Sequence, residues 1–141
     1  MISSTRTIPA PPAQVYAALA DVAHWPDWLD TVDSLELLDG AASPPAVGDR
    51  ATIRQPRLPA ATWTVTEVEP GHHFTWESTA PGLRFVGRHV VEPSGDGGSV
   101  VTLGIDQQGP LRGLARLLWG RLTQEYVDRE GVCLENRVLG G

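Results

Sequence analysis

Three side chains in this sequence could carry acid–base chemistry: His89, Tyr126 and Glu130. Imidazole titrates near neutrality, so His89 could take a proton from an acidic C–H group or a phenol. Tyr126 and Glu130 lie one helical turn apart, as polar exceptions on an apolar stripe. If Glu130 is buried without a positive partner, its pKa should rise. Two structural alternatives stay open: His89 buried with satisfied hydrogen bonds, and Glu130 paired with Arg129 or Arg137 at the surface.

Other chemistries lack the residues that they need. All 11 basic residues are arginine, which excludes Schiff-base chemistry, pyridoxal phosphate attachment and a P-loop lysine. Cys133 is the only cysteine, and we expect it to pack as a small apolar residue. His72 and His73 are adjacent, and neighbouring residues on a strand point to opposite faces, so we predict no shared metal there. His24 is too distant in the sequence to join them. We therefore predict no metal and no cofactor.

Size and charge narrow the class of protein. With 141 residues, the chain is predicted to form a single domain over residues 1–141. Its net charge of -6 argues against a nucleic-acid partner, which needs a clustered basic face. No apolar run approaches the roughly 18 to 20 residues that cross a bilayer, and the N-terminus does not resemble a signal peptide. We therefore expect a cytoplasmic protein without membrane insertion.

The elements that must position these residues follow from hydrophobic periodicity. Period-two alternation, broken by turn-forming residues, predicts antiparallel strands in a meander. Prolines followed by apolar residues at helical spacing predict two short helices near the N-terminus, and a long periodic segment predicts a C-terminal helix. The class is α+β. The predicted strands span residues 2–8, 32–40, 50–55, 62–68, 73–79, 83–92 and 99–107, and the predicted helices span 11–22, 25–30 and 111–138.

Strand alternation also predicts which side chains share the concave face of the sheet. In the segment 83–92 the charges alternate with a row containing Phe85 and His89, so that row should point inward. The long helix should close the space with its own apolar face, which includes Leu118. An apolar pocket with a few convergent polar groups is typical of a site for a hydrophobic small molecule. The predicted ligand-binding residues from strands and the long helix are Gln55, Trp63, Trp76, Phe85, Leu103, Trp119 and Leu122.

Two motifs give the chain a family resemblance. PPAQVYAALADVAHWPDWLDTV contains a helix followed by A-D-x-x-x-W-P-x-W, and EPSGDGGSVVT forms a hairpin. Together they resemble the polyketide cyclase/dehydrase branch of the START-like (SRPBCC) superfamily. The resemblance implies a helix-grip fold: a curved antiparallel sheet of about six to seven strands wrapped around a long C-terminal helix, with two short helices after the first strand. It also implies that Trp25 and Trp28 plug the junction of the short helices, with Trp28 or Leu29 reaching the mouth of a cavity.

Three functions stay open, because this superfamily has many activities. The first is binding of a hydrophobic aromatic, polyketide-like or lipid-like molecule between sheet and helix. The second is a cyclase, aromatase or dehydratase that uses His89, Tyr126 and Glu130 as acid/base groups, with Arg54 steering a carboxylate or thioester at the rim. The third is a protein-partner or chaperone-cofactor module, for which a cavity below about 300 Å³ would be expected. Edge strands could also pair two copies as a homodimer.

Overall fold

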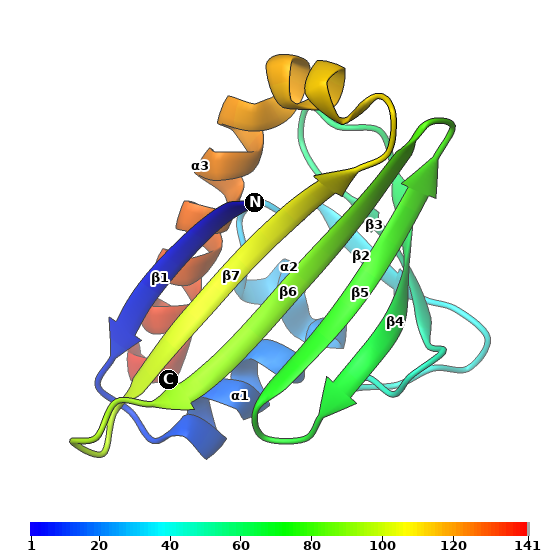
Figure 1. The fold of residues 1–141 in the computed structure, drawn as a ribbon. Coiled ribbons are helices and arrows are strands. Elements are labelled where there is room, and N and C mark those ends of the chain that lie inside the picture. The colour runs from blue at the N-terminus through cyan, green and yellow to red at the C-terminus, as the bar shows by residue number, and fades with distance from the viewer. Residues whose placement is uncertain (141) are drawn as a thin grey trace.

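The computed structural model describes residues 1–140 and contains one curved antiparallel sheet and three α-helices (Figure 1). The sheet has seven strands in the order β1-β7-β6-β5-β4-β3-β2. Figure 1 shows the long helix α3 lying against the concave side of the sheet. The strands are β1 (Ile2–Ile8), β2 (Ser34–Leu37), β3 (Arg50–Arg54), β4 (Ala61–Glu69), β5 (His73–Ala80), β6 (Leu83–Pro93) and β7 (Ser99–Gln108). The helices are α1 (Pro12–Ala20), the 3-10 turn η1 (Val22–His24), α2 (Trp25–Trp28) and α3 (Arg112–Gly140).

The predicted α+β helix-grip fold is confirmed. Strands β2 to β7 form an antiparallel meander. The last of them, β7, also pairs antiparallel with β1, from Ile2 opposite Ile105 to Ile8 opposite Ser99. Most strand ends lie within two residues of the prediction. The predicted helix 11–22 instead ends at Ala20, because the backbone of Asp21 leaves the helical region at ψ 63°. The predicted strand 32–40 is reduced to β2, which has four residues.

The two ends of the sheet are filled differently. The hydrophobic core joins α1, α2, the sheet and the C-terminal half of α3, where Leu134 and Val138 are buried. The first turns of α3 have only Ala115 buried. The N-terminal half of α3 therefore lies over a part of the sheet that side chains do not fill. The most deeply buried large side chains include Ile8, Leu19, Leu29, Phe74, Leu103 and Leu134.

Candidate functional site

A cavity of about 560 Å³ lies between the middle of α3, from Trp119 to Glu130, and the concave face of the sheet. This volume is within the roughly 300 to 1,000 Å³ that small-molecule sites occupy. Its wall is largely aromatic and aliphatic, with a few polar side chains. The predicted residues that line it are Gln55, Trp63, Trp76, Phe85, His89, Trp119, Tyr126 and Glu130. The structure thus brings all three candidate acid/base residues to one cavity.

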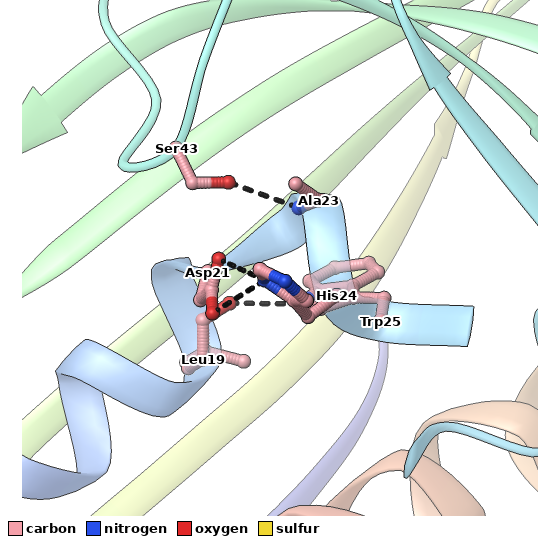
Figure 2. Close-up of polar contacts among 6 residues, drawn as sticks. All are labelled: Leu19, Asp21, Ala23, His24, Trp25 and Ser43. Carbon is pink, nitrogen blue, oxygen red and sulfur yellow. Dashed lines mark hydrogen bonds and ion pairs between the residues drawn. The ribbon is translucent and has the colours of Figure 1, made fainter. Parts of the chain in front are cut away.

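Trp25 forms part of the wall, at the corner where η1 meets α2. Its indole Nε1 donates a hydrogen bond of 2.9 Å to the carbonyl oxygen of Leu19, at the end of α1 (Figure 2). Nearby, the backbone N–H of Ala23 donates to Ser43 Oγ at 2.9 Å, which ties the corner to the loop after β2. The Trp25 ring lies edge-on to Trp76, with centroids 5.3 Å apart. The corner therefore holds a large aromatic side chain against the sheet.

Trp28, Leu103 and Leu122 differ from the prediction, since none of them lines the cavity. Trp28 packs edge-on against Trp25, with ring centroids 6.4 Å apart. Leu103 points inward as expected but is only 1% exposed, in the packed core. Leu29 is also buried in that core and does not reach the cavity mouth. The phase of the four-residue helix α2 decided which tryptophan faces inward, and one turn is too short for sequence periodicity to set that phase.

His89 is buried behind the aromatic wall. Its ring stacks on Phe74 with centroids 4.1 Å apart and an interplanar angle of 9°. Its Nδ1 lies 3.2 Å from the carbonyl oxygen of Phe74, and since a carbonyl only accepts, Nδ1 carries the proton in this contact. Burial lowers the pKa of His89 to about 4. At neutral pH the imidazole is therefore uncharged, and its Nε2 has the free lone pair.

Glu130 is a carboxyl group without a cation. Its neighbour Arg129 pairs instead with Asp30, with Nη2 and Oδ2 2.6 Å apart. Among residues 1–140, Glu130 has neither an ion pair nor a side-chain hydrogen bond. Burial raises the pKa of Glu130 to about 8. The group is thus mainly protonated at pH 7 and can donate a hydrogen bond into the cavity.

Tyr126 differs from the other two candidates because its hydroxyl already has a partner. The hydroxyl donates a hydrogen bond to the carbonyl oxygen of Pro56. This contact joins α3 to the loop between β3 and β4, whose residues Leu58, Pro59 and Ala60 also line the cavity. The phenol therefore holds one wall in place, and its oxygen can still accept a hydrogen bond from a bound molecule.

The profile of the family described as polyketide cyclase / dehydrase and lipid transport matches residues 1–133. The chain belongs to this family. Comparison with curated proteins gives no significant match. No helix within residues 1–140 of this family member is long and apolar enough to cross a membrane.

Solved structures share the fold of this polyketide cyclase family member. TTHA0849 from Thermus thermophilus is 28% identical, with a TM-score of 0.71, and 99% of this chain and 97% of that chain are covered. Norcoclaurine synthase from Thalictrum flavum, in complex with dopamine and hydroxybenzaldehyde, is 14% identical with a TM-score of 0.76 and coverage of 99% and 86%. Ara h 8.0201 is 15% identical with a TM-score of 0.70 and coverage of 99% and 97%. The last two show the fold alone.

Part of the cavity wall in this family member was not predicted from the sequence. The loop after β3 contributes Leu58, Pro59 and Ala60, although its residues were interpreted only as a break between strands. The signal was present, because three apolar residues in a loop are candidates for covering a pocket. Gln107, near the end of β7, has its side-chain Nε2 buried without a hydrogen-bond partner among residues 1–140. Arg54 is exposed and does not line the cavity.

Apolar side chains also surround the start of α3. Leu111, Leu114, Leu117 and Leu118 are exposed, and Leu117 has 81% of its surface in solvent. The backbone N–H of Leu111 donates to the carbonyl oxygen of Gly82 at 3.1 Å, next to the cavity residue Leu83. The sequence placed Leu118 on the inner face of the helix. That assignment is wrong, because α3 turns this residue to solvent.

Proposed function

We propose that this chain binds a hydrophobic, aromatic small molecule in the cavity beneath α3. The observation that carries the proposal is a space of about 560 Å³ with Trp25, Trp63, Trp76, Phe85 and Trp119 in its wall. Aromatic rings offer large contact areas and prefer edge-on or offset contact with another ring. A planar aromatic ligand therefore gains more from this wall than a flexible chain of equal volume.

The polar groups of the cavity wall indicate which functional groups the ligand should have. Protonated Glu130 can donate a hydrogen bond to a ligand carbonyl or hydroxyl oxygen, and Nε2 of His89 can accept one from a phenol. Both of these groups are uncharged at pH 7, so the hydrogen bonds that they offer suit uncharged ligand oxygens. We therefore propose a neutral ligand that combines fused or linked aromatic rings with carbonyl or phenol oxygens.

A binding screen tests this proposal. The panel contains aromatic polyketides, flavonoids, fatty acids and sterols, together with dopamine and hydroxybenzaldehyde, which norcoclaurine synthase holds in its complex. Binding is measured by quenching of tryptophan fluorescence and by thermal shift. Thr123→Trp fills the cavity from α3, and Arg121→Trp is the matched control on an exposed position that does not line the cavity.

The expected result is saturable binding of one aromatic class. At about one hundred times its Kd, such a ligand should stabilise the protein by about 2.7 kcal/mol. Thr123→Trp should lose this stabilisation, whereas Arg121→Trp should keep it. Binding that survives Thr123→Trp would place the ligand outside the cavity, and the absence of binding by every class would contradict the proposal.

The second candidate function is catalysis of the cyclase or dehydratase type. It is favoured by Glu130, whose pKa of about 8 lies near the pH of the cell, as an effective general acid requires. In a dehydration, Glu130 would give its proton to the leaving hydroxyl as the C–O bond breaks. His89 would take the proton from the adjacent carbon, although a pKa of about 4 makes it a weak base. The Tyr126 proton is already engaged with Pro56, so Tyr126 would orient the substrate by accepting a hydrogen bond from one of its hydroxyl groups.

Glu130→Gln separates binding from catalysis. Glutamine keeps the size and a hydrogen-bond donor but cannot give up a proton. With a β-hydroxy carbonyl compound from the class that binds, the variant should lose turnover and keep ligand affinity within about tenfold, which corresponds to roughly 1.4 kcal/mol. Equal turnover by the variant and the wild type would exclude Glu130 as the acid and leave the binding function intact.

A further inference from the structure

The turn between β4 and β5 brings together three side chains that none of the functions above uses. Glu69 ends β4, and His73 begins β5 as its paired residue across the two strands. Pro70 and Gly71 form the turn, and the backbone N–H of His72 donates to the carbonyl oxygen of Glu69 at 2.9 Å. Gly71 has φ +82°, which a type II turn requires at this position. The turn thus places Glu69, His72 and His73 at the same end of the hairpin.

The assumption that His72 and His73 point to opposite faces is wrong. That rule holds within a strand, but His72 still belongs to the turn. Its Nδ1 lies 3.1 Å from Nδ1 of His73 and 3.1 Å from Oε2 of Glu69. The remaining distance, from Nδ1 of His73 to Oε2 of Glu69, is 3.5 Å. Three potential ligand atoms therefore form a nearly equilateral triangle.

These distances match one face of a tetrahedral metal site. With metal–ligand bonds of about 2.0 to 2.1 Å, ligands at tetrahedral corners lie about 3.3 Å apart. Hydrogen bonds among the three side chains cannot satisfy both Nδ1 atoms and Oε2 of Glu69 at once. Protons on both Nδ1 atoms would face each other across 3.1 Å, whereas a single proton leaves two lone pairs opposed. A cation above the triangle would turn all three lone pairs into favourable contacts.

We propose that Glu69, His72 and His73 form a binding site for a divalent transition-metal ion of the zinc type. Two imidazoles and one carboxylate suit such an ion better than Mg²⁺ or Ca²⁺, which prefer oxygen ligands. The backbone that holds them is fixed: Val91 N–H donates to the carbonyl oxygen of His72 at 2.7 Å. The three side chains are 64%, 40% and 26% exposed, so an ion can enter and water can complete its coordination.

The site is separate from the ligand cavity. None of its three residues lines that cavity. Figure 1 shows the β4–β5 turn at the end of the sheet beside α1, opposite the β5–β6 turn near the start of α3. The hydroxyl of Tyr16 in α1 donates to the carbonyl oxygen of His73 at 3.4 Å. The bound ion would therefore fasten the hairpin end that packs on α1 and would take no part in chemistry in the cavity.

Zinc titration of the protein tests the site. Protein without a polyhistidine tag is freed of metal with a chelator and titrated with ZnCl₂ against a chromophoric chelator. Glu69→Gln, His72→Ala and His73→Ala each remove one ligand. His24→Ala is the matched control, because His24 also contacts a carboxylate, Asp21 at 2.9 Å, but has no third ligand in the described chain. Circular dichroism verifies that each variant is folded.

The expected result is one equivalent of bound zinc and a rise in Tm of several degrees. Each of the three variants should weaken binding by at least about tenfold, a loss found even for partners outside the ligand set. His24→Ala should bind as the wild type does. The proposal is overturned if no saturable binding occurs, or if the three variants bind zinc as tightly as the wild type.

A second measurement does not depend on the variants being folded. In wild-type protein, zinc should shift the ring ¹⁵N resonances of His72 and His73, while those of His24 and His89 stay in place. Co²⁺ in the same site should give the visible absorption bands of tetrahedral coordination. Ring shifts at His24 with none at His72 would contradict the assignment.

Discussion

Glu130 and His89 share a cavity, but burial shifts their pKa values in opposite directions. Removal from water disfavours the charged form of each group. The pKa of the carboxyl therefore rises to about 8 and that of the imidazole falls to about 4. Both groups are neutral at pH 7, which is compatible with an aromatic wall. A donor and an acceptor of hydrogen bonds are thereby available without a buried charge.

The Glu130 carboxyl should make stability depend on pH. The unfolded chain ionises this group near pH 4.5, whereas the folded protein keeps the proton until about pH 8. The folded state thus loses stability as pH rises through this interval, by at most about 1.4 kcal/mol per pH unit. Glu130→Gln removes the dependence. Urea unfolding at pH 5, 6.5 and 8 should show the variant gaining stability relative to the wild type at each step.

The His89 imidazole makes stability depend on pH in the opposite direction, below neutral pH. The unfolded chain binds a proton near pH 6.5 and the folded protein only near pH 4, so stability falls as pH drops between these values. In the Glu130→Gln background this dependence should become visible as unfolding free energy that rises from pH 4.5 to 6.5. A constant difference between variant and wild type at all pH values, with no such rise, would show that neither pKa is shifted as stated.

Gly87 tests how tightly the aromatic wall is packed. A Cβ atom at this position would lie 2.8 Å from Cδ1 and 2.9 Å from Nε1 of Trp76. Gly87→Ala should therefore destabilise the protein by about 1 to 3 kcal/mol, the usual cost of overpacking. Gly113→Ala is the control, because a Cβ atom there would meet no heavy atom within 4 Å. Thermal unfolding of the two variants should differ; equal Tm values would mean that Trp76 moves freely.

Among the elements, α3 is held against the sheet by core packing and by several polar contacts. Its C-terminal half packs in the core, and Glu135 forms an ion pair with Arg6 of β1 at 2.5 Å. Its middle is joined to the β3–β4 loop by the hydrogen bond from Tyr126 to the carbonyl of Pro56. This second contact fixes the wall that the loop contributes to the cavity. The ion pair of Arg57 with Glu125, with Nη2 and Oε2 3.6 Å apart, also joins this loop to α3.

Tyr126→Phe should loosen that loop with a small effect on global stability. A single hydrogen bond at an accessible carbonyl contributes about 0.5 to 1.5 kcal/mol. The amide of Leu58, which donates to the carbonyl of Gln55 at 3.2 Å, should exchange with deuterium faster in the variant. Tyr16→Phe removes a hydroxyl at the other end of the sheet and should leave this exchange unchanged. Equal protection of Leu58 in all three proteins would refute a role of Tyr126 in holding the loop.

At the scale of the whole molecule, packing is uneven from one end of the sheet to the other. The end near α1 is a continuous core, whereas the cavity lies beneath the middle of α3 and exposed leucines surround the first turns of that helix. Regions with few buried apolar contacts open at lower free energy than the global fold. Entry of a ligand therefore needs only local movement at the cavity end.

Hydrogen exchange should show this gradient along α3. Amides in residues 112–122 are expected to exchange faster than those in residues 127–138, because only Ala115 is buried in the first segment, whereas the second contains most of the buried residues of α3. A bound ligand should slow exchange most strongly between residues 119 and 130, which line the cavity. Uniform exchange along the helix, with or without ligand, would contradict the difference in packing between the two ends of the sheet.

The sequence was informative where local patterns are long. Period-two alternation set the strands from Arg50 onward, and the long helix was placed within two residues of its observed ends. The alternation in β6 put Phe85 and His89 on the inner face, and both line the cavity. These patterns are reliable because a shift of one residue would move a whole apolar row into solvent.

Periodicity does not predict the conformation of short elements or the contacts between residues that are far apart in the sequence. The turn before β5 lets His72 approach His73, which strand alternation alone excluded. Ion pairing of Arg129 with Asp30 left Glu130 without a cation, although Arg129 is its immediate neighbour in the sequence. Both outcomes depend on the backbone path of distant or irregular segments.

The amino-acid sequence by itself determined the antiparallel sheet, the long C-terminal helix, the family and the aromatic character of the inner face. Periodicity and residue type are local properties, and they decide which face of an element is buried. Only the tertiary structure decided that Trp25, and not Trp28, borders the cavity, that the Tyr126 hydroxyl is engaged, and that Glu130 stays protonated. Volume, desolvation and hydrogen-bond partners arise from segments far apart in the chain, so they exist only once the chain is folded.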